Sequence, residues 1–223
     1  MKNKDIFTFR DAEKQAGPVA FSTMLKPAGS ACNLDCHYCY YLDKAVQYGG
    51  KQAVMSDELL ELYVKQYIGA NDVDTVQFCW HGGEPLLLGV DFYRRAMAFQ
   101  QKYADGKRIE NTLQTNGTLV DEAWCDLFAG NNFLVGVSLD GPQDIHDTFR
   151  LTKGGKPTFE RVMQTISMFQ RSGVEYNTLS VVNRLCEGRG GEIYRFFRDT
   201  VHSRYMQFLP AVEHVVDKPG FHR

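Results

Sequence analysis

The sequence predicts an α/β fold in which six parallel strands and their connecting helices form a (β/α)6 partial TIM barrel. Short apolar runs alternate with longer segments of helical periodicity along most of the 223 residues. Each helix must return the chain to the same edge of the sheet, and this return requires parallel strands. The least ordinary sequences all follow expected strands, at the edge where parallel sheets form their sites. An open, doubly wound parallel sheet has the same periodicity and is the alternative.

The first half of the chain contains three expected strands and two expected helices. The strands are short apolar runs that close on Pro, Gly or Asn-Gly, and they cover 21–29, 74–85 and 108–117. The helices repeat apolar residues at helical spacing over 56–70 and 91–104. Ser56 precedes the first helix and is its expected N-cap.

The second half repeats the pattern with three strands and three helices. The expected strands cover 132–141, 174–183 and 204–213, and the expected helices cover 121–130, 158–173 and 191–201. Acidic residues occupy the first turn of 121–130, and Gly130 follows its last turn. Gly173 stops the helix over 158–173. Counted together, six strands are joined by five crossover helices.

The length and composition suit one domain with a full-sized core. The chain has 43% hydrophobic residues, and it contains no low-complexity segment or long linker. We expect an N-terminal extension over 1–19, the core domain over 20–213 and a C-terminal tail over 214–223.

The charge and hydropathy of the chain argue against several functional classes. The net charge is −2, and Lys and Arg are scattered, so no positive field attracts nucleic acid or a membrane surface. No stretch approaches the 20 or so apolar residues that a transmembrane helix needs. The N-terminus is polar and lacks the apolar segment of a secretory signal. We therefore expect a cytoplasmic protein.

Three cysteines lie close together in "ACNLDCHYCYYLD", residues 31–43. Cys32, Cys36 and Cys39 supply soft thiolates, which bind iron–sulfur clusters or zinc. A structural zinc needs four protein ligands, and the fourth would be His37 or a distant residue. A cubane cluster with three cysteine ligands leaves one iron open to a small molecule. The loop therefore favours such a cluster, with zinc or incidental cysteines as alternatives.

Other strand ends carry polar residues that, taken alone, are weaker evidence for a binding site. "GGEP" closes the second strand as a common Gly-Gly turn does, yet two glycines also let carbonyl groups approach an ammonium ion. Glu84 would add a negative charge nearby. Ser138 ends the fourth strand, where its hydroxyl satisfies local backbone or binds a ligand. Arg150 is either a solvated charge or the partner of a carboxylate.

The remaining histidines and cysteines are expected to be structural. His81 packs or hydrogen-bonds beside the site, and His146 fixes the segment before Arg150. The dispersed cysteines are read as small buried apolar residues rather than ligands, and they are Cys79, Cys125 and Cys186.

The C-x3-C-x2-C spacing, with Tyr38 before the last cysteine, resembles the radical S-adenosylmethionine superfamily. The resemblance implies a [4Fe–4S] cluster on Cys32, Cys36 and Cys39, with S-adenosylmethionine chelating the fourth iron. It also implies electron transfer to the sulfonium and formation of a 5′-deoxyadenosyl radical. The "GGE" of this sequence is similar to the superfamily motif that receives the methionyl amino group.

Longer segments, among them "WHGGEPLLLG", "LQTNGTLVDEAWCDLF" and "FLVGVSLDGPQDIHDTFR", resemble the anaerobic sulfatase-maturating enzymes from about residue 20 to 213. That family oxidises a cysteine or serine of a sulfatase to Cα-formylglycine. The resemblance implies a sulfatase polypeptide as substrate and a flavodoxin or ferredoxin as electron donor. The cofactor-binding residues that it implies are Tyr38, Gly82, Gly83, Glu84, Pro85, Gln114, Asn116, Ser138, Arg150, Asn177 and Val212.

The C-terminus departs from the family pattern. Members carry a further SPASM-type domain with two auxiliary clusters and an aspartate proposed as the base, and nothing after Val212 supplies these. The catalytic base is therefore unknown in this sequence, and apolar surface on the last strand is expected to be exposed. Another peptide-modifying radical enzyme, a catalytically incompetent fragment and a zinc-binding module are the alternatives.

Overall fold

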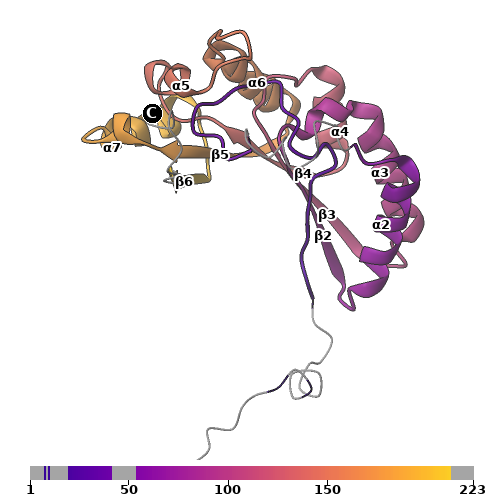
Figure 1. Ribbon diagram of the computed structural model, residues 1–223. Coiled ribbons are helices and arrows are strands. Elements are labelled where there is room, and N and C mark those ends of the chain that lie inside the picture. Colours follow the sequence, from indigo (N-terminus) through magenta and orange to yellow (C-terminus); the bar gives the residue numbers. More distant parts are fainter. Residues whose placement is uncertain (1–7, 9, 11–19, 42–53, 212–223) are drawn as a thin grey trace, which may run out of the picture.

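The computed structural model describes residues 8, 10, 20–41 and 54–211. Its centre is a six-stranded sheet in the order β1-β2-β3-β4-β5-β6, with every pair of neighbours parallel (Figure 1). The strands are β1 (Met24–Leu25), β2 (Thr75–Trp80), β3 (Arg108–Thr115), β4 (Phe133–Ser138), β5 (Glu175–Val182) and β6 (Met206–Pro210). The strand order follows the chain without reversal, whereas a doubly wound sheet reverses its order. The partial barrel is therefore confirmed.

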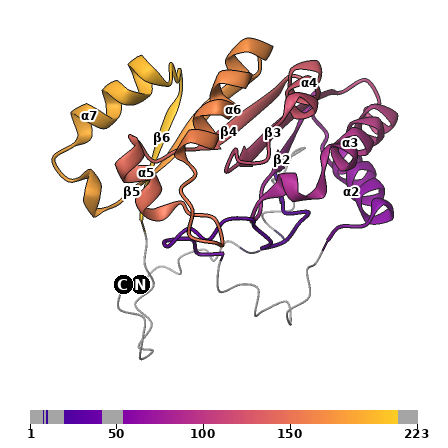
Figure 2. The ribbon, with the colours of Figure 1, turned by 90° about the horizontal axis from the view of Figure 1, so that it is seen from above.

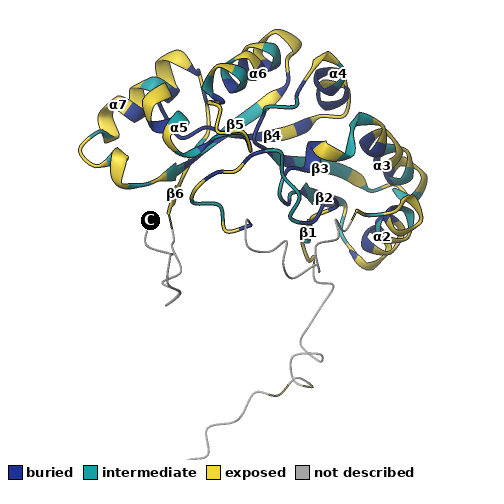
Figure 3. Ribbon diagram, turned by 45° about the horizontal axis from the view of Figure 1, so that its top comes forward, coloured by how far each residue is buried: buried dark blue, intermediate teal, exposed yellow. Residues whose placement is uncertain are grey.

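Helices cover one side of this sheet. Figures 2 and 3 show them in an arc on the convex side, with their outer surfaces exposed. The α-helices are α2 (Asp57–Ala70), α3 (Val90–Tyr103), α4 (Glu122–Gly130), α5 (Gln143–Phe149), α6 (Phe159–Ser172) and α7 (Gly190–Arg195). Short 3-10 turns, η2 (Pro85–Leu88) and η3 (Arg184–Cys186), follow β2 and β5. Each crossover thus returns on the same side, as a curved sheet requires.

The core lies between the strands and the helices. Alternate residues of β2 are fully buried there, with Val76, Phe78 and Trp80 against the helices. Their neighbours on the strand point to the concave side, which no described helix covers. A parallel sheet covered on both sides would instead be apolar at every position. The concave face is free to carry polar side chains.

Several element ends differ from the sequence expectation. β1 has only two residues, because the chain enters a turn directly after Leu25. Gly130 lies inside α4, and the left-handed residue beyond the helix is Asn132, with φ 51°. Asn tolerates that conformation because its short side chain bonds locally. The expected helix over 191–201 is α7 followed by a π-helical turn, η4 (Phe196–Thr200).

The caps that the sequence indicates are confirmed at two helices. The Ser56 side chain accepts a hydrogen bond from the Leu59 N–H at the start of α2. Gly173 ends α6 in the left-handed conformation, with φ 69°. Helix α5 was not expected, because its seven residues are too few to display a periodicity.

Most of both chain ends lies outside the described residues. Val212 and the tail over 214–223 lie outside the described residues, as does the extension over 1–19 except for residues 8 and 10. The exposed apolar surface expected on the last strand is present on β6, at Phe208 and Leu209.

Within the described ranges, no helix is long and apolar enough to cross a membrane.

Candidate functional site

The three-cysteine loop follows β1 and is held against the segment after α5. The Asp35 N–H donates to the Leu151 carbonyl at 2.8 Å, and the His37 N–H donates to the Phe149 carbonyl at 3.1 Å. Leu34 forms an antiparallel bridge with Thr152. These contacts join two segments more than a hundred residues apart and fix the loop at the rim of the barrel.

The three thiols of this loop influence one another. Burial raises the pKa of the Cys36 thiol to about 12; the Arg150 cation opposes the rise, and the thiols of Cys39 and Cys32 add to it. Burial also raises the pKa of Cys32, to which Glu84 and Cys39 contribute. With the pKa raised in this way, the Cys32 and Cys36 thiols favour the protonated form when no cation is bound. Binding of a soft cation to them releases protons.

Asn116, at the end of β3, touches the first of these cysteines. Its Nδ2 lies 3.7 Å from the Cys32 Sγ and donates to the Asn33 Oδ1 at 2.9 Å. The Leu34 N–H also points at the Cys32 Sγ, at 3.4 Å. Hydrogen bonds to ligand sulfurs tune the potential of iron–sulfur clusters. The end of the "QTNG" segment therefore lies against the cysteine loop. That Gln114 and Asn116 bind the cofactor stays a prediction.

The glycines of "GGEP" permit a close backbone contact. The Gly83 N–H donates to the Gly29 carbonyl at 3.0 Å, and a Cβ on Gly83 would lie 2.1 Å from the Ala31 oxygen. No larger residue fits there, because the obstacle is backbone rather than a flexible side chain. The glycines were expected to admit an ammonium ion. In the structure, Gly83 admits the loop that leads to Cys32, and a contact with the ammonium stays a prediction.

Glu84 is fully buried and joins two strand ends. Its Oε1 accepts hydrogen bonds from the Leu86 N–H and the Thr115 hydroxyl, and its Oε2 accepts one from the Asn116 N–H. Burial raises the pKa of this carboxyl to about 7, against the effect of the three donors. Both oxygens are engaged within the protein. Its observed role is therefore to hold β3 against the turn after β2.

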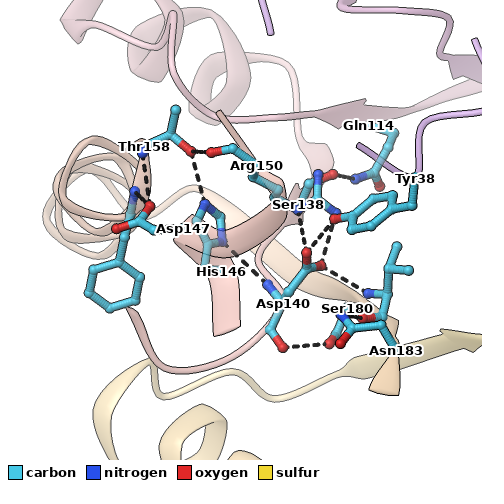
Figure 4. Close-up of polar contacts among 12 residues, drawn as sticks. Tyr38, Gln114, Ser138, Asp140, His146, Asp147, Arg150, Thr158, Ser180 and Asn183 are labelled. Atoms are coloured by element: carbon cyan, nitrogen blue, oxygen red, sulfur yellow. Dashed lines mark hydrogen bonds and ion pairs between the residues drawn. The ribbon is translucent and has the colours of Figure 1, made fainter. Parts of the chain in front are cut away.

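A row of polar side chains crosses the concave face at one level. Gln114, Gly136 and Asn177 are register partners on β3, β4 and β5. The Gln114 Nε2 donates to the Ser138 Oγ at 3.0 Å (Figure 4). The Oδ1 of Asn177 is buried and has no hydrogen-bond partner among the residues that the structure describes. A buried acceptor without a donor is costly, so this row indicates a ligand that supplies an N–H or O–H group.

Arg150 is only 8% exposed, so of its two possible roles the solvated charge is excluded. Its guanidinium group makes a two-pronged ion pair with Asp140, at 3.0 Å through both Nε and Nη2. The Tyr38 hydroxyl also donates to Asp140. Asp140 belongs to "SLDGP", yet nothing in its spacing marked it as a member of the site.

The structural roles expected of the other histidines and cysteines are confirmed only in part. His146 is buried and contacts the Asp140 N–H and Thr158, and burial lowers its pKa to about 4. This confirms that it fixes the segment before Arg150. The Nδ1 of His81 accepts from the Gly82 N–H at 2.7 Å. All six cysteines are free; Cys125 is buried as expected, whereas Cys79 and Cys186 are half-buried.

The described site residues fit an iron–sulfur cluster and S-adenosylmethionine. Three neighbouring thiols on one loop suit a cubane with one open iron. Among the described residues, no three His, Cys, Asp or Glu side chains converge on a single metal-ion position. A cubane does not need such convergence, because each thiolate binds a different iron. The unpartnered Asn177 oxygen and the polar row beside it suit a ligand rich in N–H and O–H groups. Pro85 is buried at the start of η2.

The chain matches the model of the radical SAM superfamily over residues 27–186. That match covers most of its length. Together with the partial barrel and the three-cysteine loop at its rim, it shows that the chain belongs to the radical SAM superfamily.

Within that superfamily the chain is similar to anaerobic sulfatase-maturating enzymes. It is 48% identical to the serine-type enzyme of Bacteroides thetaiotaomicron, over 86% of this chain and 47% of that protein. It is 39% identical to the cysteine-type enzyme of Clostridium novyi, over 91% of this chain and 54% of that protein. The chain thus spans about half the length of the curated relatives that it matches.

Solved structures give the same result. The structure of native anSMEcpe with bound AdoMet and the Kp18Cys peptide superposes with a TM-score of 0.81 at 35% identity, over 90% of this chain and 54% of that one. Streptococcus suis SuiB bound to S-adenosylmethionine superposes with a TM-score of 0.64 at 15% identity, which shows the fold alone.

Proposed function

We propose that this chain is the radical-generating core of an anaerobic sulfatase-maturating enzyme. Cys32, Cys36 and Cys39 hold a [4Fe–4S] cluster, and the strand ends around them bind S-adenosylmethionine. The observation that carries this proposal is the cysteine loop itself, which hydrogen bonds to the Phe149 and Leu151 carbonyls fix at the barrel rim. When bound and reduced, the cluster supplies the electron that cleaves S-adenosylmethionine and forms the 5′-deoxyadenosyl radical.

The residues of the chain bind and orient these groups. The "GGEP" carbonyls receive the methionyl amino group, and Arg150 receives the carboxylate through the N–H groups that Asp140 leaves free. Ser138, Gln114 and Asn177 form hydrogen bonds from the concave face. Cys36 is itself buried, and Tyr38 beside it helps to exclude water from the cluster.

The substrate is a sulfatase polypeptide, of which one cysteine or serine becomes Cα-formylglycine. Support comes from relatives of both the serine and the cysteine type. It also comes from the similar anSMEcpe structure with a bound peptide. A reduced flavodoxin or ferredoxin supplies the electron, and the reaction takes place in the cytoplasm.

Anaerobic reconstitution with iron and sulfide tests the proposed cluster. The native chain should turn brown and bind about four irons. Cys36→Ala should lose most of that iron and its visible absorbance, because a cubane held by two thiolates is labile. Iron and sulfide analysis with absorbance spectroscopy measures both.

The matched control is Cys186→Ala, which removes a half-buried thiol outside the cysteine loop. It should load iron like the native chain. A Cys36→Ala variant with full iron content would contradict the ligand assignment. One tightly bound zinc in place of iron would support a zinc module instead.

A further inference from the structure

Asp140 follows β4, and its buried carboxylate is surrounded by donors (Figure 4). Its Oδ1 accepts from the Arg150 Nη2 and, at 2.9 Å, from the Val181 N–H. Its Oδ2 accepts from the Arg150 Nε and from the Tyr38 hydroxyl. One side chain therefore joins the cysteine loop, the end of β5 and the segment after α5.

Arg150 has little freedom to move within this arrangement. Two of its three nitrogens bond to Asp140, and its guanidinium carbon lies 5.4 Å from the centre of the Tyr38 ring. Its Nη1 makes no hydrogen bond to any residue in the described part of the chain. The fork geometry of a guanidinium group fixes the direction of the remaining N–H groups once two donors are bound.

The backbone at both ends of this pair is also fixed. The Asp140 N–H points at the His146 Nδ1, and the Arg150 N–H donates to the His146 carbonyl at 3.0 Å. The Thr158 hydroxyl donates to the Arg150 carbonyl at 2.7 Å, so it accepts from the His146 Nε2, which carries the proton. Neutral His146 thus links residues 140, 150 and 158.

The same segment holds the cysteine loop. Phe149 and Leu151, on either side of Arg150, accept the His37 and Asp35 N–H groups. Displacement of Arg150 would therefore disturb the loop as well as the guanidinium group. Asp140 and Arg150 also both influence the Cys36 thiol electrostatically, which places the ion pair beside that ligand.

We propose that Asp140 is a positioning residue that aims the free Nη1 of Arg150 at the carboxylate of S-adenosylmethionine and holds the cysteine loop through Tyr38. This inference rests on the proposed function, in which Arg150 binds that carboxylate. A buried ion pair gives little net stability, because desolvation offsets the attraction. The Asp140 carboxylate instead fixes three separate segments relative to one another.

The test is a double-mutant cycle on S-adenosylmethionine binding. The chain is loaded with its cluster, kept oxidised, and titrated with S-adenosylmethionine by calorimetry. Arg150→Gln and Asp140→Asn should each weaken binding about tenfold while the iron content is kept. The double variant should bind no more weakly than Arg150→Gln, because the effect of Asp140 on the cofactor carboxylate passes through Arg150.

The control is Asp144→Asn, which breaks an exposed ion pair with Arg189 and should leave the affinity unchanged. Unchanged affinity in Asp140→Asn beside a weakened Arg150→Gln would overturn the positioning role alone. An additive loss of about a hundredfold in the double variant would also overturn it. Unchanged affinity in Arg150→Gln would remove Arg150 from the cofactor site and refute that part of the proposed function, and the positioning role with it.

A second measurement applies if Asp140→Asn does not load its cluster. Hydrogen exchange on the cluster-free chain should show faster exchange at the Asp35 and His37 amides, with α2 unaffected. Equal exchange at these two amides in the variant and the native chain would overturn the inference.

Discussion

Among single residues, Glu84 shows how buried hydrogen bonds hold the strand ends of the site together. Its carboxyl group bonds to the turn after β2 and to Asn116 at the end of β3, whose side chain contacts Cys32. Burial raises the pKa of the carboxyl from 4.5 to about 7. The folded state therefore favours the protonated form. The stability that follows from the raised pKa of Glu84 is fully present below pH 4.5 and is lost as the pH rises through about 7.

The cluster-free chain should accordingly lose stability between about pH 4.5 and 7 relative to Glu84→Gln, which cannot ionise. The expected relative change is about 3 kcal/mol, because one pKa unit corresponds to about 1.4 kcal/mol. Urea unfolding under reducing conditions at a series of pH values measures it.

The control for Glu84 is Glu187→Gln, which changes an exposed carboxyl group. Its stability should follow the native chain at every pH. Parallel pH profiles for the native chain and Glu84→Gln would show that Glu84 keeps its ordinary ionisation in the fold.

Among the elements, β4 contributes Gly136 to the polar row of the concave face. A Cβ there would lie 2.1 Å from the Gln114 Oε1 and 2.9 Å from a Leu179 methyl group. The Gln114 amide is the far end of a flexible side chain, so it can move away at small cost. Moving it would break its hydrogen bond with Ser138.

Gly136→Ala should therefore leave the fold nearly as stable as before and yet weaken S-adenosylmethionine binding about tenfold. Thermal unfolding and calorimetric titration of the cluster-loaded chain separate the two effects. Gly130→Ala, in α4 with open space around it, should keep the native affinity and slightly stabilise the helix. Native affinity in Gly136→Ala would remove the polar row from the cofactor site.

The elements also show what local sequence can predict. Alternating periods indicated the strands and crossover helices, and the Ser56 and Gly173 caps marked helix ends correctly. The parallel order follows from those crossovers. Helix α5 was not predicted, because two turns display no periodicity. Strand β1 is shorter than its apolar run, because the turn after it begins early.

The candidate site was predictable only where its signal is local. Cys32, Cys36 and Cys39 form a spacing pattern within eight positions. Asp140 meets Tyr38 across 102 positions and Val181 across 41 positions, and no sequence period encodes such contacts. Burial of Arg150 depends on the same long-range packing.

At the scale of the whole molecule, the fold separates stability from function. The convex side buries the core under helices, and the concave side keeps a polar face below the cysteine loop. Loops from successive strands meet at one rim, so the three cysteines and the polar row lie toward the same end of the barrel. The three cysteines and the polar row all lie within residues 20–41 and 54–211, which the structure describes.

The most direct test of the central claim is the reductive cleavage of S-adenosylmethionine. The anaerobically reconstituted chain is reduced with dithionite in the presence of S-adenosylmethionine, and 5′-deoxyadenosine is measured by liquid chromatography. The native chain should release 5′-deoxyadenosine, and Cys36→Ala should release none. Native protein that holds its iron and binds S-adenosylmethionine yet releases no 5′-deoxyadenosine would contradict the account.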